Sequence, residues 1–431
     1  MKSLSRYTFD YAFRVLLVLL PFMTVLSVFT KEKLGILGFS FVKELLLISM
    51  LMTLVIYHIT RKMRILWTRY DIAILVYVLI LVVISSYTTH ARGIIYGGRY
   101  DFSFLIAFFV IIHGYSFLEK PLSYYLRLFL FSGGIMLFIS MLLKWPLSED
   151  LLLYLGYSGN PSNWQFGSSI PIFHGVDGAN VRRFQWLLDG PNTMGAFLLI
   201  YAGIFAYYFR EKKSWFFVVW WALLLLSILI FFTYSRSAVI GLFLWVGIII
   251  LFLLRYLFTH YKRQFITLIW VFIFMIWGIF VQYAGNMKAI LERGGSTSGH
   301  MERMKMGIER FTTHPLGQWL GSAGPAYRYV QDLTSVDRQK IEEMDRYYIP
   351  ESWYIQQLIE GGIFWFLAFM TIMIMVGWSL YRVHIVLLGT FISICAMNFF
   401  LHTFESSVVS LSLFLLFGLI LGYSRRTYVQ K

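Results

Sequence analysis

The chain has 431 residues, of which 58% are hydrophobic and only 14% charged, and its mean hydropathy is +0.68. Soluble domains carry roughly 25% charged residues, so this composition excludes an ordinary water-soluble domain. The net charge of +15 would indicate nucleic-acid binding in a soluble protein, but in a membrane protein it is explained first by basic cytoplasmic loops, and we expect no nucleic-acid partner.

Apolar runs recur along the whole chain, and a bilayer-spanning helix needs about 20 such residues. The run 11–30 lacks a small-residue cleavage site, so we interpret it as a transmembrane helix and not as a signal peptide. Twelve spans are predicted, at residues 11–30, 40–59, 71–88, 102–117, 124–143, 192–209, 215–232, 238–257, 266–283, 362–380, 383–401 and 406–421. The expected fold is an all-α polytopic membrane protein, with residues 1–431 forming a single transmembrane domain and tight helical hairpins at Tyr234 and Arg382.

The basic residues of the short loops predict the orientation. If the N-terminus is cytoplasmic and the count is twelve, every basic cluster lies on the inner side, as the positive-inside rule requires. These clusters are Arg61, Lys62, Arg64 and Arg69; Arg210, Lys212 and Lys213; Arg255, Lys262 and Arg263; and Arg425, Arg426 and Lys431. The C-terminus is then also cytoplasmic.

Two long segments, 144–191 and 284–361, lie on the outer face in this topology. The second is a large loop that precedes the tenth span. Within it, residues 300–311 carry apolar side chains at helical spacing, namely Met301, Met304, Ile308 and Phe311. We expect an amphipathic helix that lies on the membrane surface or packs over the spans.

Arginines on the outer side oppose membrane insertion and therefore need a reason. Arg236 is the clearest case, because it lies in the short hairpin 233–237 between two apolar spans. Further outer arginines are Arg92, Arg99, Arg182, Arg183, Arg293, Arg303 and Arg310. Each either reaches toward lipid phosphates or pairs with an acid, or contributes to a cationic pocket. Two or three arginines suit a pyrophosphate, because arginine grips phosphate oxygens through two parallel hydrogen bonds.

The segment Gly190-Pro191-Asn192-Thr193 indicates a turn followed by the start of the sixth span. We expect Asn192 to cap this helix by accepting hydrogen bonds from its first backbone N–H groups. The alternative is that the helix N-terminus faces an anion.

Three titratable residues precede or begin the tenth span. Glu351 is either a general base or an acid favoured by the helix dipole. Glu360 lies one or two turns deeper, where an acid is costly unless it is paired or functional. His300, in the large loop, is a second candidate proton acceptor.

Several common catalytic motifs are absent from the sequence. The nine histidines are scattered and the single cysteine, Cys395, lies in an apolar run, so we expect no metal site. No phosphate-binding loop, dinucleotide fingerprint or serine nucleophile elbow is present. We therefore expect neither a cofactor nor nucleotide hydrolysis.

Taken in order, these motifs resemble those of the bacterial O-antigen ligase and polymerase family. The hairpin Thr233-Tyr234-Ser235-Arg236-Ser237-Ala238 resembles a signature of that family, and the segment from Gly190 to Gly195 resembles its Pro-Asn element. The other matching elements are Ser298-Gly299-His300 with Arg303, His314-Pro315-Leu316-Gly317, Glu351-Ser352-Trp353-Tyr354 and Glu360-Gly361-Gly362. No single motif is specific, and the resemblance rests on their order over roughly residues 180–420.

The resemblance implies a GT-C-like glycosyltransferase of the bacterial plasma (inner) membrane, with its active site on the outer face. Family members take a glycan from an undecaprenyl diphosphate carrier and use neither nucleotide sugar nor metal. Wzy-type polymerases pass the glycan to another lipid-linked repeat, with a flippase and a chain-length regulator as further partners, whereas ligases pass it to lipid A–core. The family's diphosphate-binding arginines match Arg236, Arg303 and one of Arg182 and Arg183.

One departure from the family bears on the reaction. Ligases place a His, thought to activate the acceptor, where this chain has Glu351 followed by Ser352. We therefore expect Glu351 to take the proton of the acceptor hydroxyl, with His300 as the alternative, and we favour a polymerase over a ligase. The predicted reaction is a displacement at the sugar C1 atom that inverts the anomeric configuration and leaves undecaprenyl diphosphate.

Two other functions compete with this prediction. A flippase or polysaccharide exporter needs charged residues along a path through the bilayer, but these spans are almost free of ionisable groups except near their outer ends. That pattern favours an enzyme with a one-sided site. A non-catalytic scaffold for other envelope enzymes is the second alternative.

Overall fold

The computed structural model describes residues 2–61, 67–86, 88, 90–145, 147–148, 150–159, 170–176, 179–212, 216–260, 294–329 and 348–429. The N-terminal half contains helices α1 (Lys2–Leu19), α2 (Met23–Leu34), α3 (Val42–Arg61), α4 (Arg69–Ser85), α5 (Ala91–Asp101), α6 (Ser103–Gly114), α7 (Leu122–Lys144) and α8 (Leu151–Tyr154). Next come an antiparallel pair of strands, β1 (Gly175–Val176) and β2 (Ala179–Arg182), and helices α9 (Pro191–Phe209), α10 (Phe216–Phe232), α11 (Arg236–His260), α13 (Gly294–Thr313), α15 (Trp353–Val383), α16 (Ile385–Met397) and α17 (Ser407–Val429). Short 3-10 turns are η1 (Leu20–Phe22), η2 (Leu37–Phe41), η3 (Tyr115–Phe117), η5 (Pro325–Tyr329) and η7 (Thr403–Glu405).

The predicted spans agree with helices wherever the structure describes them. Only the ninth, 266–283, lies outside the described residues. Six of the described helices are long and apolar enough to cross a membrane, and the bent pair α5–α6 makes a possible seventh, while α10, α11 and α16 are shorter apolar helices. The chain is thus an all-α, multi-pass membrane protein, and the count of twelve stays a prediction.

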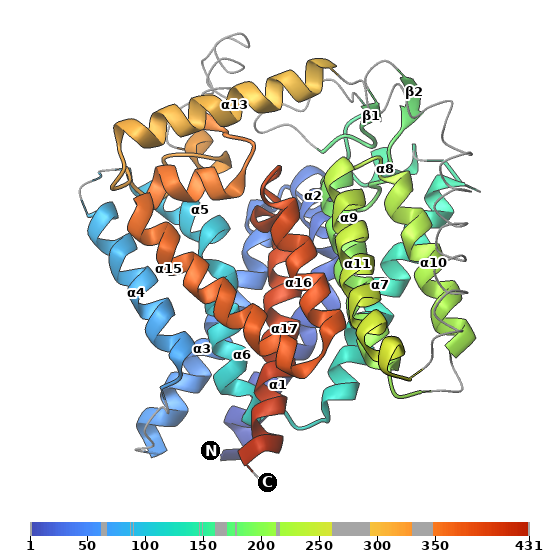
Figure 1. Cartoon of the computed structure of the whole chain (residues 1–431). Coiled ribbons are helices and arrows are strands. Elements are labelled where there is room, and N and C mark those ends of the chain that lie inside the picture. The colour runs from blue at the N-terminus through green and yellow to red at the C-terminus, as the bar shows by residue number, and fades with distance from the viewer. Residues whose placement is uncertain are drawn as a thin grey trace.

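The long helices form one bundle with two distinct ends (Figure 1). Both termini lie at one end, which we call the terminus end, and α13, α8 and the β1–β2 pair lie at the other, the loop end (Figure 1). The Arg425 guanidinium stacks over the Tyr70 ring at 5.0 Å, which brings the C-terminal basic cluster beside the one at Arg69. These two basic clusters therefore lie together, and the gathering of the others on the same side stays a prediction. Which end faces the cytoplasm stays a prediction.

Burial separates central from peripheral helices. In the most apolar stretch of α17, 83% of the residues are buried inside the protein, against 22% in α3. The outward side chains of α3 are nevertheless apolar, namely Leu45, Ile48, Met52, Ile56 and Ile59. A stripe of this kind is unfavourable in water and natural in lipid, so α3 belongs to the lipid-facing perimeter while α17 lies in the core.

Both predicted hairpins are present. Helix α10 ends at Phe232 and α11 begins at Arg236, with Tyr234 at a positive φ of 49° in the turn. Helices α15 and α16 are separated by His384 alone. The tenth span differs from the prediction, because its helix begins at Trp353 and not at residue 362. Gly362, with a φ of 69°, bends α15 at the predicted start.

Candidate active site

The residues around Glu351 form a charged cluster where α13 passes over the start of α15. Arg303 donates from its guanidinium to Oε1 of Glu351 in an ion pair. The Nδ1 atom of His300 lies 3.2 Å from Oε2 of the same carboxylate. His300 and Arg303 are three residues apart on α13 and therefore lie on one face of the helix. The structure thus brings together three residues that were predicted separately.

Close packing holds α13 over this position. A Cβ atom on Gly307 would stand 2.7 Å from both Pro350 and Ile355, so only glycine allows the helix to approach this far. Met304 and Phe311 pack against the small cluster of Ala323, Ile355 and Ile359. Helix α13 thus covers residues 300–311, where an amphipathic helix was predicted, and it packs against the start of α15. Its other two apolar side chains, Met301 and Ile308, remain exposed, because the buried face is centred on Gly307.

Glu351 itself adopts an unusual backbone conformation, with a φ of 56°. The neighbouring chain fixes it there. The N–H of Trp353 donates to the carbonyl oxygens of Asn398 (3.1 Å) and Leu401 (3.2 Å), so the first turn of α15 is tied to the loop that follows α16. Left-handed backbone at a residue with a side chain costs energy and is found where surrounding structure imposes it, often at functional sites.

The charges around Glu351 favour its ionised form. Burial by itself would raise the pKa of this carboxyl, but the hydrogen bond from His300 and the charges of His300, His402 and Arg303 lower the pKa below its ordinary value. Glu351 is therefore a carboxylate at neutral pH and is able to accept a proton. Its basicity is modest as long as these cations surround it.

His402 and Glu405 extend the cluster and were not predicted. The Nδ1 atom of His402 lies 3.4 Å from Oε1 of Glu405 in the connection between α16 and α17. Burial lowers the pKa of His402, but the charges of Glu405, Glu351 and Asp101 raise it above the ordinary histidine value. The sequence signal was available: a His and a Glu three residues apart in a short connection between two apolar helices.

A buried polar network lies directly behind Glu351. Asp101, at the bend between α5 and α6, is fully buried and accepts hydrogen bonds from Trp353 Nε1 (3.0 Å), Gln357 Nε2 (2.9 Å) and Gln356 Nε2 (3.3 Å). All three donors belong to the first turns of α15. Asp101 therefore fixes the position of the helix that Glu351 precedes. Sequence reasoning missed it, because Asp101 directly borders an apolar run.

Glu360 and Gly362 hold the large loop against α15. Glu360 is fully buried, and its Oε1 accepts from the N–H of Ala323 at 3.3 Å. The N–H of Gln318 donates to the carbonyl oxygen of Ile359 at 3.0 Å. A Cβ atom on Gly362 would lie 2.2 Å from the Leu316 backbone and one on Gly317 would lie 2.5 Å from the Gly361 backbone. These two glycines allow direct backbone contact between the loop and the bend.

The α10–α11 hairpin forms a second group of predicted residues. Ser235 lies just before α11, and its hydroxyl accepts from the N–H of Ala238 at 3.4 Å. Arg236 is the first residue of the helix and is half-buried. Arg183 joins this hairpin to α9, because its Nε donates to the Thr233 carbonyl oxygen (2.9 Å) and its NH2 to Oδ1 of Asn192 (3.0 Å).

The expectation that Asn192 caps α9 is wrong. The N-cap residue is Gly190, which has no side-chain hydrogen bond, and Pro191 occupies the first helical position. Proline suits that position because it has no N–H to satisfy. Asn192 lies two residues past the cap position, and its side-chain oxygen instead accepts a hydrogen bond from Arg183.

Other outer arginines have structural partners. Arg182 is exposed, and its guanidinium lies 4.2 Å from the centre of the Phe173 ring. Arg99 pairs with Glu44 at 2.7 Å. Arg310 is buried and donates to the carbonyl oxygen of Ser322 at 2.8 Å. Arg293 lies outside the described residues. In the part of the chain that the structure describes, no group of three or more His, Cys, Asp or Glu side chains is arranged to hold a metal ion.

A family model described as O-antigen ligase matches residues 221–370. The chain carries an O-antigen ligase family domain. The match covers about a third of the chain and runs from α10 to the middle of α15, so the O-antigen ligase domain includes Arg236, His300, Arg303 and Glu351. No curated protein matches the chain. A domain of this family implies a glycosyltransferase-like activity on a lipid-linked glycan and an acceptor.

Proposed function

We propose that the protein polymerises a surface polysaccharide, by moving a glycan from an undecaprenyl diphosphate carrier to the sugar of another lipid-linked repeat. The observation that carries this proposal is the cluster of Glu351, His300 and Arg303 at the loop end, within the O-antigen ligase domain. It combines a proton acceptor with a cation suited to a diphosphate.

The proposed step is a single displacement. The acceptor hydroxyl attacks C1 of the donor sugar, the bond between C1 and the diphosphate oxygen breaks, and the hydroxyl proton passes to Glu351, with His300 as the alternative acceptor. The diphosphate leaves with the electron pair, and Arg236 and Arg303 stabilise its charge. The anomeric configuration is inverted, and the step needs no metal.

The ion pair between Arg303 and Glu351 couples donor binding to the basicity of Glu351 in this mechanism. Arginine has five N–H donors, so Arg303 is able to contact a diphosphate and a carboxylate together. When the donor diphosphate draws the Arg303 charge away, the pKa of Glu351 rises toward its ordinary value, because a neighbouring cation had lowered it. Donor binding would then make Glu351 a better base.

The arginines near the hairpin divide by their contacts. Arg183 uses its Nε and one NH2 group within the protein, and Arg182 is exposed at the edge of β2. We assign the main diphosphate contacts to Arg236, at the start of α11, and to Arg303, beside Glu351, and the alignment of the hairpin with α9 to Arg183. Pro191, Asn192 and Ser235 support that alignment.

The test compares chain formation in cells that carry variants of the protein. We expect Glu351→Gln and Arg236→Lys each to lower polymer formation at least about 100-fold, the typical contribution of an acid–base group or a transition-state donor. Glu309→Gln on the exposed side of α13 and Arg92→Lys on the exposed side of α5 serve as matched controls. If both site variants form chains like the wild type, the proposed site is wrong.

A further inference from the structure

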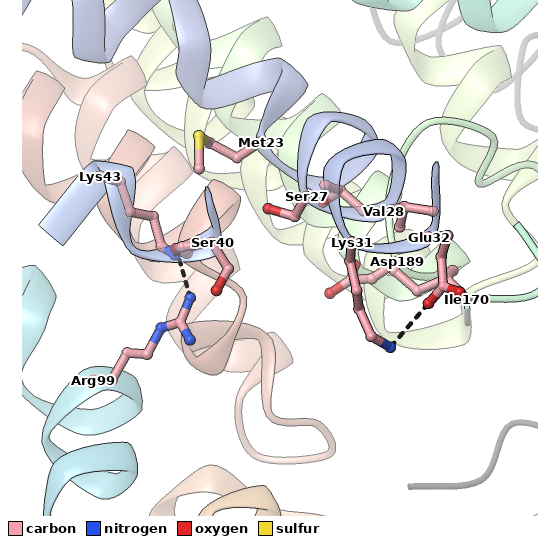
Figure 2. A pocket seen from close by; sticks show the side chains of 12 residues that line it. Met23, Ser27, Val28, Lys31, Glu32, Ser40, Lys43, Arg99, Ile170 and Asp189 are labelled. Atoms are coloured by element: carbon pink, nitrogen blue, oxygen red, sulfur yellow. Dashed lines mark hydrogen bonds and ion pairs between the residues drawn. The ribbon is translucent and has the colours of Figure 1, made fainter. Parts of the chain in front are cut away.

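A polar cavity of about 300 Å³ lies between α2, η2, the start of α3 and α5 (Figure 2), and its lining shares no residue with the Glu351 cluster. The loop before α9 and the first residue of α17 complete its wall. Polar side chains that line it are Thr24, Ser27, Lys31, Glu32, Ser40, Lys43, Arg99, Asp189 and Ser407. The proposed reaction uses none of these residues.

Buried charges form one wall of this cavity. The side chain of Lys43 is only 5% exposed, and its Nζ donates to the Ser40 carbonyl oxygen (2.7 Å) and pairs with Glu44 (3.1 Å). Arg99 pairs with the same carboxylate at 2.7 Å and also donates to the Ser40 carbonyl oxygen. An ammonium group has three donors, and the bonds to Ser40 and Glu44 occupy two. A buried cation with remaining donor capacity suits a bound polar ligand.

Asp189 supplies an acceptor on the opposite wall. Its Oδ1 atom is buried and has no hydrogen-bond partner among the described residues. Burial raises the pKa of this carboxyl, while a hydrogen bond from Thr193 acts in the other direction. A buried acceptor without a partner destabilises the protein, so a hydrogen bond from a ligand hydroxyl to this atom would be favourable.

The charge balance indicates which ligand the cavity suits. The lining holds three basic side chains, Lys31, Lys43 and Arg99, and two acidic ones, Glu32 and Asp189. A third acid, Glu44, lies outside the lining and pairs with both Lys43 and Arg99. A diphosphate would gain little net attraction here and would meet the carboxylates. A neutral, hydroxyl-rich ligand instead fits alternating donors and acceptors. The apolar side chains of Met23, Val28 and Ile170 offer contact to the C–H groups of a sugar ring.

We propose that this cavity binds one neutral sugar residue of the acceptor glycan. The assignment rests on the proposed function, because it presumes an acceptor saccharide at the loop end. Along the chain, two of the lining residues lie close to residues already described beside the candidate site. Ser407 follows Glu405 of the His402 pair by two residues, and Asp189 directly precedes the Gly190-Pro191-Asn192 turn. The volume lies at the lower end of the range for ligand pockets, about 300 Å³, which suits a single residue and not a chain.

The test fills the cavity without touching the transfer site. In the Ser27→Trp variant the indole occupies the space of the sugar, and Ser27→Leu is the smaller substitution in case tryptophan prevents folding. Ser86→Trp, on the exposed end of α4, is the matched control. Two quantities are measured on purified protein in lipid: the KM for the acceptor during transfer, and binding of the lipid-free repeat oligosaccharide released from the host's surface polysaccharide.

We expect Ser27→Trp and Ser27→Leu to raise the acceptor KM and to weaken oligosaccharide binding by about 10-fold or more, equivalent to about 1.4 kcal/mol. The donor KM and the rate at saturating acceptor should stay unchanged, as should all values for Ser86→Trp. If folded Ser27 variants keep wild-type acceptor KM and binding, or if inorganic pyrophosphate and not the oligosaccharide binds at this cavity, the inference is wrong.

If the proposed function is wrong, the transfer and binding measurements give a different pattern. In that case the wild type transfers no glycan, and the binding measurement alone decides the inference. Oligosaccharide binding that Ser27→Trp abolishes and Glu351→Gln leaves intact supports the cavity. A wild type that binds no oligosaccharide overturns it.

Discussion

Glu351 combines a left-handed backbone, a half-buried carboxylate and two cationic neighbours on α13. Each feature has a cost that the neighbouring residues offset: the bonds of Trp353 fix the backbone, and His300 and Arg303 compensate the charge. A residue that only caps a helix does not need this combination of features. It is expected for a group that must present a charged atom at one fixed place.

The pH dependence of transfer distinguishes Glu351 from His300 as the base. The neighbouring cations lower the pKa of Glu351 below the ordinary glutamate value of 4.5. The carboxylate therefore stays ionised at pH 4.5 and is protonated only at lower pH. If Glu351 accepts the proton, the acidic limb of kcat/KM for the free enzyme lies below about 4.5. An acidic limb at higher pH that disappears in His300→Gln would assign the base to His300 instead.

Asp101 is expected to act through position and not through direct contact with substrate. Replacing it by leucine leaves the Trp353 and Gln357 donors buried without an acceptor, which costs about 1–3 kcal/mol for each donor. We expect Asp101→Leu to lower the unfolding temperature of the purified protein by several degrees, and Asp150→Leu on the exposed loop before α8 to leave it unchanged. An unaltered unfolding temperature in Asp101→Leu would show that the network does not stabilise α15.

At the scale of elements, the contact between the large loop and the bend in α15 depends on glycine. Gly362 has a φ of 69°, and an added Cβ would lie 2.2 Å from the Leu316 backbone. A backbone contact of this kind has no flexible side chain that is able to move aside. The bend therefore fixes how the loop, and with it α13, is placed over Glu351.

Gly362→Ala should consequently reduce both stability and transfer. The positive φ and the backbone clash together should cost more than about 1 kcal/mol. Gly247→Ala is the matched control, because that glycine lies within α11 with open space around its Cβ position. Thermal unfolding and chain formation are the measurements. Equal values for the Gly362 and Gly247 variants would contradict a structural role for the bend.

The elements were more predictable than their connections. Apolar length predicted the described spans and both hairpins, because a lipid-exposed helix must be apolar along its whole length. It did not predict the start of α15, since Gln356, Gln357 and Glu360 look like loop residues but are buried in a polar network. The sequence also predicted the wrong cap for α9, because the side chain of Asn192 accepts a hydrogen bond from Arg183, which precedes the helix by eight residues.

The candidate site was also predictable only in part, because tertiary contacts bring its residues together. Residue type and placement indicated Glu351, His300, Arg303 and Arg236 one by one, but spacing along the chain does not show that α13 passes over Glu351. Asp101, His402 and Glu405 were missed because they join the cluster through tertiary contacts. Three-dimensional proximity was the missing information.

At the scale of the whole molecule, the two ends of the bundle differ in chemistry. The basic clusters at Arg69 and Arg425 meet at the terminus end, whereas the Glu351 cluster and α13 lie at the loop end (Figure 1). This asymmetry supports an enzyme whose site opens on one face over a transporter with a charged path through its centre.

The orientation follows from the same asymmetry and is testable with single cysteines. In a Cys395→Ala background, which removes the one natural cysteine, Met301→Cys on α13 should react with a membrane-impermeant maleimide in right-side-out spheroplasts. Lys212→Cys, in the turn after α9, should react only after lysis. The reverse pattern would place the Glu351 cluster on the cytoplasmic side and contradict the topology.

The most direct test of the central claim is transfer by the purified protein in liposomes that contain lipid-linked repeats. We expect glycans of more than one repeat to appear on the lipid carrier, undecaprenyl diphosphate to be released, and both products to be lost in Glu351→Gln. Transfer to lipid A–core alone would instead identify a ligase. Movement of the repeats between leaflets without new glycosidic bonds, or no change in them at all, would contradict the account.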